Sequence, residues 1–397
     1  MRRLLLVLIA CACARAPQAP ILTISGSTLG KEGAVLKGQI ARFMRTNPGV
    51  TVTIQETPDD ATQRHQLYVQ WLNAHVGRPD VLQLDVIWTA EFAAAGWILP
   101  LDRFAPPDGF FPATLAANRW RGRLYALPWF VDTGMLYWRS DLLPRAPRTF
   151  AELDADARAR RVDDGFVWQG ARYEGLVTVF VEFLGGYGGE ILTGDGRVVV
   201  NSDAGVRALT AMRDQIRGGI APREVLTWHE EESRFAFQNG RALFMRNWPY
   251  AVAPMSDPQR SRVAGRFGVA PMPAAPGGHP TAALGGAELA INAWSAHPDL
   301  AWRLIGFLTA PEQMRERLRV VGEYPARPTL YDSPALRGVR PIVEAATPRP
   351  VTPIYAELSD ELQVALHRVL SGEAEPKPEL DDAAARMQKL IDESGLR

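Results

Sequence analysis

The strongest constraint on the fold is the alternation of strand-like and helix-like segments over residues 21–86. Apolar strand patterns at 21–25, 50–54 and 80–86 are separated by amphipathic helical patterns, the second of them at about 61–74. Consecutive strands of this kind are joined by right-handed crossovers through a helix, which produce a mainly parallel sheet. The sequence therefore predicts an α/β fold.

The chain is too long for one domain. At 397 residues it exceeds the size at which a single hydrophobic core keeps growing, so two lobes are expected. Residues 128–133 are interpreted as the first passage between the lobes, and the Pro- and Gly-rich segment 269–280 as the return. The predicted boundaries are 21–127 plus about 281–330 for the N-terminal lobe, and 128–280 plus about 331–397 for the C-terminal lobe.

Residues 1–10 resemble a lipoprotein signal peptide. Arg2 and Arg3 precede a short apolar stretch, and Leu8-Ile9-Ala10-Cys11 resembles the lipobox, in which the cysteine is lipidated. These features predict export, lipidation at Cys11 and a tether at 11–20, so that the membrane is reached only through the anchor. An apolar leader with an incidental cysteine and a misassigned start codon are the alternatives.

Composition excludes several kinds of site. Lys plus Arg and Asp plus Glu each number 44, so no net field favours nucleic acid as a partner. The only cysteines, Cys11 and Cys13, lie in the leader region, so no disulfide, zinc thiolate or cysteine nucleophile is expected in the folded body.

Common catalytic and metal motifs are missing from the sequence. No phosphate-binding loop, dinucleotide-binding glycine motif or nucleophile elbow is present, and no two histidines have the spacing of a helical zinc site. We therefore expect no cofactor, no metal and no enzymatic activity. Carboxylates are plentiful, and a secreted glycoside hydrolase with paired acids stays open as an alternative.

Aromatic and polar residues occur together where predicted strands end. Asp85 lies at a strand end with Trp88 close behind, Asp132 follows Pro-Trp-Phe-Val, and Trp248 and Tyr250 follow a short strand. Ligands of α/β sheets bind beyond the carboxyl ends of strands. Carboxylates accept hydrogen bonds from sugar hydroxyls, and flat rings cover the C–H face of a pyranose. The pattern favours a carbohydrate ligand.

The assembled segments resemble the trehalose- and maltose-binding proteins of ABC importers, and also the trehalose-binding lipoprotein of mycobacteria. The resemblance extends from about residue 21 to the end of the chain. It is carried by LDVIWTAEF at 84–92 with GW at 96–97, LYALP at 124–128, GFVWQG at 165–170, YEGLV at 173–177, NWPY at 247–250, LGG at 284–286, and PRP at 348–350 with Tyr355.

The resemblance implies a two-lobed periplasmic-binding-protein fold of type II, in which hinge crossings join two sheets flanked by helices and the ligand cleft lies between the lobes. It also implies a set of sugar contacts, namely Glu32, Arg64, Asp85, Asp132, Glu230 or Glu231, Trp248, Tyr250, Gly286 and Arg349. In this interpretation the acids accept hydroxyl hydrogen bonds, the arginines donate and the rings stack.

Ala287 is a departure from the pattern. The archaeal disaccharide binders place a Trp after the Gly-Gly pair, whereas this chain has Ala287 and therefore lacks one stacking ring. The missing ring is expected to widen the site or to shift its preference among disaccharides.

The expected function is non-catalytic capture of a disaccharide, trehalose or maltose, by hinge closure. The resemblance implies delivery by a monomer to the transmembrane subunits of an ABC permease, from a periplasmic or cell-surface location. Another sugar or a glycerol-phosphate-like solute is the alternative ligand in the same fold, and the phosphate compound would require a cationic cluster in the cleft.

Overall fold

The first sheet is built by the alternating N-terminal segment. The computed structural model describes residues 20–28, 30–58, 61–160 and 162–395, so the predicted leader, Cys11 and nearly all of the tether lie outside the described residues. The segment contains β1 (Ile21–Gly26), α1 (Gly30–Thr46), β2 (Thr51–Glu56), α2 (Ala61–Asn73) and β3 (Val81–Asp85). Strand β1 pairs in parallel with β2 and with β3, which confirms the predicted parallel arrangement.

A long strand from the second half of the chain completes this sheet. Strand β11 (Ala282–Ile291) pairs antiparallel with β3 on one side and with β6 (Ala126–Thr133) on the other. A short strand, β12 (Ala346–Thr347), pairs in parallel with the beginning of β11. Because β11 lies between β3 and β6, strand ends that are far apart in the sequence become neighbours.

The second sheet is smaller and mixed. Its order is β10 (Phe267–Ala270), β7 (Met135–Arg139), β9 (Ala242–Asn247) and β8 (Asp164–Val167). Gly134 is the single residue between β6 and β7, so the chain passes almost directly from the first sheet to the second. The separate hairpin joins β4 (Arg119–Trp120) to β5 (Arg123–Leu124).

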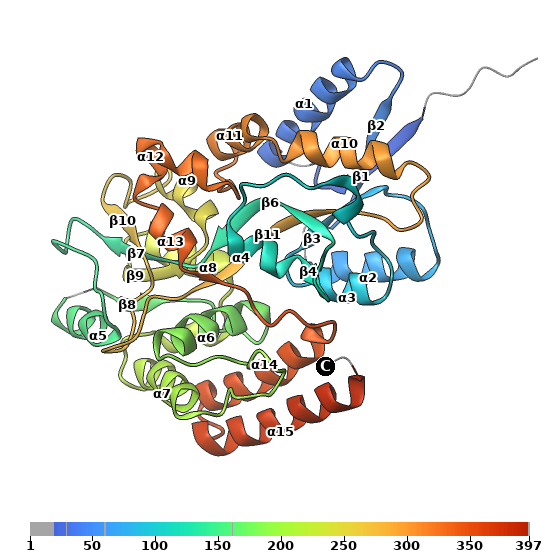
Figure 1. The fold of residues 1–397 in the computed structure, drawn as a ribbon. Helices are drawn as coiled ribbons and strands as arrows, with labels where there is room; N and C mark the ends of the chain where they lie inside the picture. Colours follow the sequence, from blue (N-terminus) through green and yellow to red (C-terminus); the bar gives the residue numbers. More distant parts are fainter. Residues whose placement is uncertain (1–19, 29, 59–60, 161, 396–397) are drawn as a thin grey trace, which may run out of the picture.

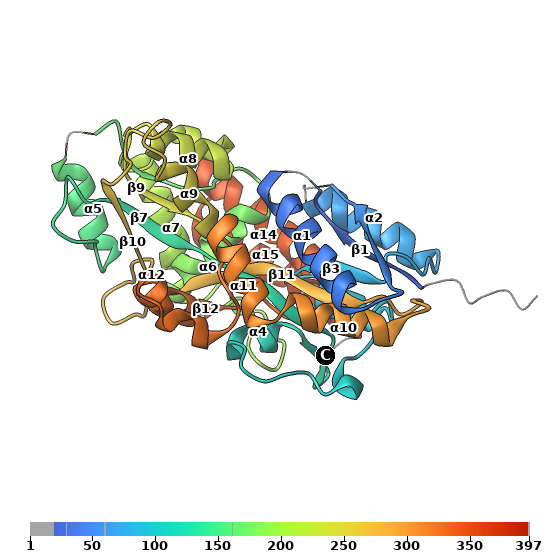
Figure 2. The same ribbon diagram turned by 90° about the horizontal axis from the view of Figure 1, so that it is seen from above.

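Helices cover both sheets (Figures 1 and 2). On the first sheet, α1 packs with α10 (Pro298–Leu308) and α11 (Pro311–Val320). On the second, α6 (Glu174–Gly186) and α7 (Asp203–Arg217) pack with the C-terminal α14 (Tyr355–Ser371) and α15 (Pro376–Ser394). The predicted cap of α7 is confirmed, because the Ser202 side chain accepts a hydrogen bond from the Gly205 N–H.

The remaining helices of the described residues are short. The α-helices are α3 (Thr89–Ala94), α4 (Pro112–Ala117), α5 (Phe150–Ala159), α8 (Glu230–Gln238), α9 (Val252–Met255), α12 (Pro334–Arg337) and α13 (Arg340–Glu344). The 3-10 helices are η1 (Asp102–Phe104), η2 (Arg223–Thr227), η3 (Pro249–Ala251) and η4 (Pro328–Asp332).

The segment interpreted as the first crossing forms a strand. Residues 128–133 are the body of β6 and stay paired with β11 as far as Thr133, and Gly134 leads on to β7 of the second sheet. Pro128 is tolerated inside this strand, at the point where the β6–β11 register shifts. Helix α13, which the predicted boundary places in the C-terminal lobe, packs against β6 of the first sheet.

Candidate functional site

The main cavity lies between the two sheets and has a volume of about 530 Å³. A volume of this size is within the range of small-molecule sites. Its wall is formed by residues of both sheets and of the segments beyond them: Ala61, Arg64, Gln83, Asp85, Phe130, Asp132, Tyr173, Glu174, Gly175, Thr178, His229, Glu230, Trp248, Tyr250, Gly285, Gly286, Ala287 and Arg349.

Strand register brings the predicted residues of the first sheet together. Asp85 ends β3 and is paired with Ala287, while Asp132 of β6 is paired with Gly285. Both carboxylates therefore flank β11 at the same edge of the sheet. Arg64 of α2 completes this side of the wall, and its guanidinium lies 5.3 Å from the ring centroid of Trp88.

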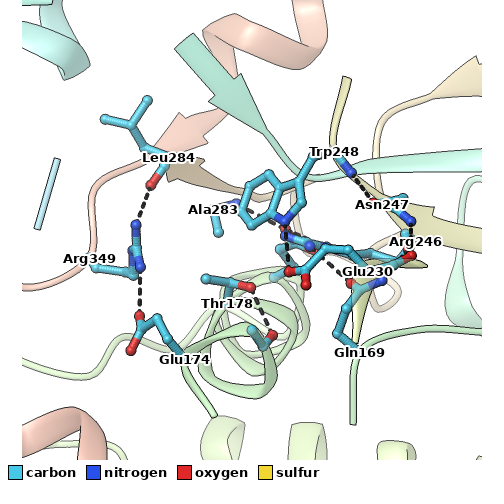
Figure 3. A network of polar contacts seen from close by, with 12 residues as sticks. Gln169, Glu174, Thr178, Glu230, Arg246, Asn247, Trp248, Ala283, Leu284 and Arg349 are labelled. Atoms are coloured by element: carbon cyan, nitrogen blue, oxygen red, sulfur yellow. Dashed lines mark hydrogen bonds and ion pairs between the residues drawn. The ribbon is translucent and has the colours of Figure 1, made fainter. Parts of the chain in front are cut away.

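The second sheet contributes the aromatic side of the wall. Trp248 and Tyr250 follow β9, and Glu230 begins α8. The indole Nε1 of Trp248 donates a hydrogen bond of 3.2 Å to Glu230 Oε1, and the backbone N–H of Trp248 donates to Asn247 Oδ1 at 2.8 Å (Figure 3). Glu230 thus holds the edge of the Trp248 ring, and Asn247 holds the backbone of the same residue.

Arg349 joins both sides of the cavity. Its guanidinium donates to Glu174 Oε1 at 2.6 Å and to the Leu284 carbonyl at 3.2 Å (Figure 3). It also lies 3.8 Å from Asp85 Oδ1. Tyr355 donates to the same Glu174 oxygen at 2.6 Å. Arg349 is buried, and its guanidinium is already paired with the Glu174 carboxylate.

Negative charge is concentrated around Asp132. The pKa of its carboxyl is raised to about 7, first by burial and then by the nearby carboxylates of Glu323, Asp85 and Glu32, whereas Arg246 opposes the rise. Burial also raises the pKa of the Tyr173 hydroxyl, which therefore stays protonated. The wall offers carboxylate acceptors beside hydroxyl groups and aromatic rings.

Two predicted residues, Glu32 and Glu231, are not among the residues that line the cavity. Glu32 lies 3.6 Å from the buried Arg317 guanidinium. Glu231 binds Arg234 and accepts a hydrogen bond of 2.7 Å from the Tyr250 hydroxyl, and the Arg234 contact lowers the pKa of the Glu231 carboxyl. Their partners are arginines distant in sequence or on the next helical turn, which the sequence patterns did not indicate.

Several wall residues were not predicted. Tyr173 and His229 precede α6 and α8, and Glu174 is the first residue of α6, so these three residues line the cavity from helix beginnings rather than from strand ends. Tyr173 and His229 contact each other with ring centroids 4.3 Å apart. The adjacent aromatic and carboxylate residues at 173 and 174 are the same signal that indicated the other positions, so a search beyond strand ends would have found them.

The described residues contain neither a cluster of His, Cys, Asp and Glu able to hold a metal ion nor a helix whose length and apolarity would suit a bilayer crossing.

Residues 26–315 match the family model described as bacterial extracellular solute-binding protein. The chain belongs to this family. It is 34% identical to a probable ABC transporter-binding protein of Deinococcus radiodurans, an alignment that covers 96% of each chain. The family and this relative are binding proteins by name.

Solved structures agree with this assignment. Maltose-bound MalE3 of T. maritima superposes with a TM-score of 0.83 at 38% identity, covering 93% of this chain and 99% of that one. The GacH receptor of Streptomyces glaucescens, solved unliganded and with acarbose, has a TM-score of 0.82 at 25% identity and covers 94% and 98%. These relatives confirm the predicted two-lobed α/β binding-protein fold.

Proposed function

We propose that this solute-binding protein captures a disaccharide, maltose or trehalose, in the cavity between its sheets. The observation that carries the proposal is the composition of the wall, in which the carboxylates of Asp85, Asp132 and Glu230 line the same cavity as the rings of Trp248 and Tyr250. Carboxylates bind neighbouring hydroxyls and rings cover a C–H face, a combination that suits a pyranose.

Two relatives support the class of ligand. The T. maritima structure at 38% identity contains maltose, and the S. glaucescens receptor was solved with acarbose. Neither supports a phosphorylated solute. In this chain Arg349 is engaged by Glu174, which reduces its availability for an anionic ligand.

The proposed mechanism is hinge closure without catalysis. Wall residues come from both sheets, so a sugar that contacts both favours the closed state. The closed form would deliver the sugar to the transmembrane subunits of the permease. Lipidation at Cys11 would hold the protein, as a monomer, close to that permease and raise their effective concentration.

A calorimetric screen tests the proposal. Purified protein is titrated with trehalose, maltose, sucrose, palatinose, glucose, longer maltodextrins and glycerol phosphate. Saturable binding of a disaccharide is expected. Tightest binding of glycerol phosphate would contradict the sugar assignment, and release of product from an aryl glycoside would favour a glycoside hydrolase instead.

Variants of the wall locate the site. Asp132→Ala and Trp248→Ala are each expected to weaken disaccharide binding at least about tenfold, or about 1.4 kcal/mol. Asp299→Ala is the matched control, because the Asp299 side chain is 90% exposed and lies outside the cavity wall. Unchanged titration curves for both wall variants would show that the sugar binds elsewhere.

A further inference from the structure

A fully buried ion pair lies behind the cavity. Glu182 of α6 and Arg246 of β9 both have side chains that are 0% exposed. Arg246 Nη2 donates to Glu182 Oε1 at 2.5 Å, and Arg246 Nε donates to Glu182 Oε2 at 2.8 Å. Removing two charges from water is costly, and a pair of apolar residues is often as stable. A gain in stability therefore does not explain why an ion pair is buried here.

The guanidinium of Arg246 lies against the ring of Trp248. Its central carbon is 3.9 Å from the ring centroid, which is a close cation–π contact. The Gln169 side chain fixes the guanidinium further by accepting a hydrogen bond of 3.1 Å from Arg246 Nη1 (Figure 3). One face of the Trp248 ring is thus supported by a cation that is itself held by buried groups.

The same pair contacts the segments that pass between the sheets. Glu182 Oε1 accepts a hydrogen bond of 3.3 Å from the backbone N–H of Ala283, near the beginning of β11. A Cβ atom at Gly134 would lie 1.7 Å from that oxygen and 2.6 Å from Arg246 Nη2. Gly134 and Ala283 are joined by a backbone hydrogen bond of 3.4 Å. The ion pair thus fills the space where both segments meet.

We propose that Glu182 and Arg246 are positioning residues for ligand binding. They hold the Trp248 ring in its stacking orientation before a sugar arrives, and they fix that ring to the segments that cross between the sheets. Because a ring that is already ordered loses little conformational freedom on binding, the support increases affinity. The inference rests on the proposed function in one respect, that the sugar stacks on Trp248.

The orientation of the ring is measured without sugar. Protein labelled with 5-fluorotryptophan is studied by fluorine NMR, and the Trp248 resonance is assigned by its loss in Trp248→Phe. In Arg246→Met this resonance is expected to shift and broaden. Arg386→Met is the control, since it removes a cation from the partly exposed Arg386–Glu361 pair. It should leave the Trp248 resonance unchanged.

A double variant separates positioning from folding. Arg246→Met alone leaves Glu182 buried without its partner, so Glu182→Leu combined with Arg246→Met replaces the pair by apolar side chains. We expect this variant to melt cooperatively, to bind the disaccharide at least about tenfold more weakly and to show the altered resonance. Arg246→Lys, which keeps the charge but not the flat contact, should have an affinity between those of the double variant and the wild type.

Wild-type affinity together with a wild-type Trp248 resonance in both the double variant and Arg246→Lys would overturn the positioning role. A result that contradicts the proposed function can be distinguished from one that contradicts the positioning role. If Trp248→Ala binds the disaccharide as well as the wild type, the ring is not the stacking platform. The resonance of the sugar-free protein still decides whether the ion pair orders the ring.

Discussion

At the scale of single residues, the most unusual group in the cavity wall is the Asp132 carboxyl. Its pKa of about 7 results first from burial and then from three neighbouring carboxylates. A hydroxyl that donates to this group favours its ionised form. The surroundings of Asp132 therefore make the folded protein sensitive to pH near 7.

The stability of the protein is expected to change with pH through Asp132. The folded-state pKa of about 7 exceeds the ordinary value of 3.8, so the folded state binds the proton more tightly than the unfolded state. The stabilisation is complete below about pH 4 and is lost as the pH rises to about 7. Asn does not titrate, so Asp132→Asn should gain about 1–2 kcal/mol relative to the wild type between pH 5 and pH 8, a value reduced for solvent in the cavity.

Urea unfolding at both pH values measures this gain. Asp299→Asn, at a side chain that is 90% exposed, controls for the loss of a surface charge. An Asp132→Asn difference that is equal at pH 5 and pH 8 would show that the carboxyl is ionised throughout the range.

Ala287 is expected to set selectivity among disaccharides. It lines the cavity between Asp85 and Phe130, its partners in β3 and β6. Ala287→Trp adds a ring to this wall and reduces its space, so the order of affinities for trehalose, maltose, sucrose and palatinose should change. Calorimetric titration with each sugar measures the order, and Ala287→Val controls for a modest increase in size. If Ala287→Trp binds the four sugars in the same order of affinity as the wild type, Ala287 does not determine specificity.

At the scale of elements, strand β11 requires a glycine at position 286, beside the cavity. Gly286 has a φ of +121°, and a Cβ atom there would lie 2.3 Å from the Phe130 carbonyl oxygen of β6. The β6–β11 register shifts between Ala287 and Glu288, one residue further along. The close approach of the two strands at this point depends on the missing side chain.

Gly286→Ala should destabilise the protein by at least about 2 kcal/mol, because it combines backbone strain with a backbone clash. Gly306→Ala is the matched control in α10, where a Cβ atom meets nothing within 4 Å. It should be neutral or stabilising by up to about 1 kcal/mol. Thermal melting compares them, and equal melting temperatures for both variants would show that β6 moves to accept the new side chain.

The elements also show what the sequence was able to predict. Short apolar strand patterns separated by helical patterns identified β1 to β3 correctly, because each pattern is local. Polar and aromatic residues at predicted strand ends indicated Asp85, Asp132 and Trp248 as site residues, and these three residues line the same cavity. The pairing of β11 with both β3 and β6 depends on contacts between distant segments, and no local pattern indicated it.

Buried arginines account for the remaining differences. Arg317 and Arg234 form ion pairs with Glu32 and Glu231, which do not line the cavity. Arg246 with Glu182 supports the aromatic side of the cavity, although neither had a place in any sequence motif. Charged residues are expected at the surface, so their burial is seen only once the helices are packed.

At the scale of the whole molecule, the cavity is bounded by both sheets and by Arg349, which contacts Asp85 on one side and Glu174 on the other. A ligand that contacts both sides should draw them together. We expect saturating disaccharide to lower the radius of gyration measured by small-angle X-ray scattering. Asp132→Ala at the same sugar concentration should keep the larger value.

Superimposable scattering curves with and without sugar, under conditions where calorimetry shows saturation, would contradict closure on binding. They would indicate a preformed site in which the lobes keep one arrangement.

The backbone on both sides of residue 287 is fixed by Gly286 and by pairing with β3 and β6, while the side chain of residue 287 borders the cavity. A single codon can therefore change the ligand surface with little effect on the strands that carry it. Gene duplication followed by substitution at this position offers a short evolutionary route from one nutrient to another. A bacterium could in this way acquire uptake of a new sugar while the transporter partner and the fold stay the same.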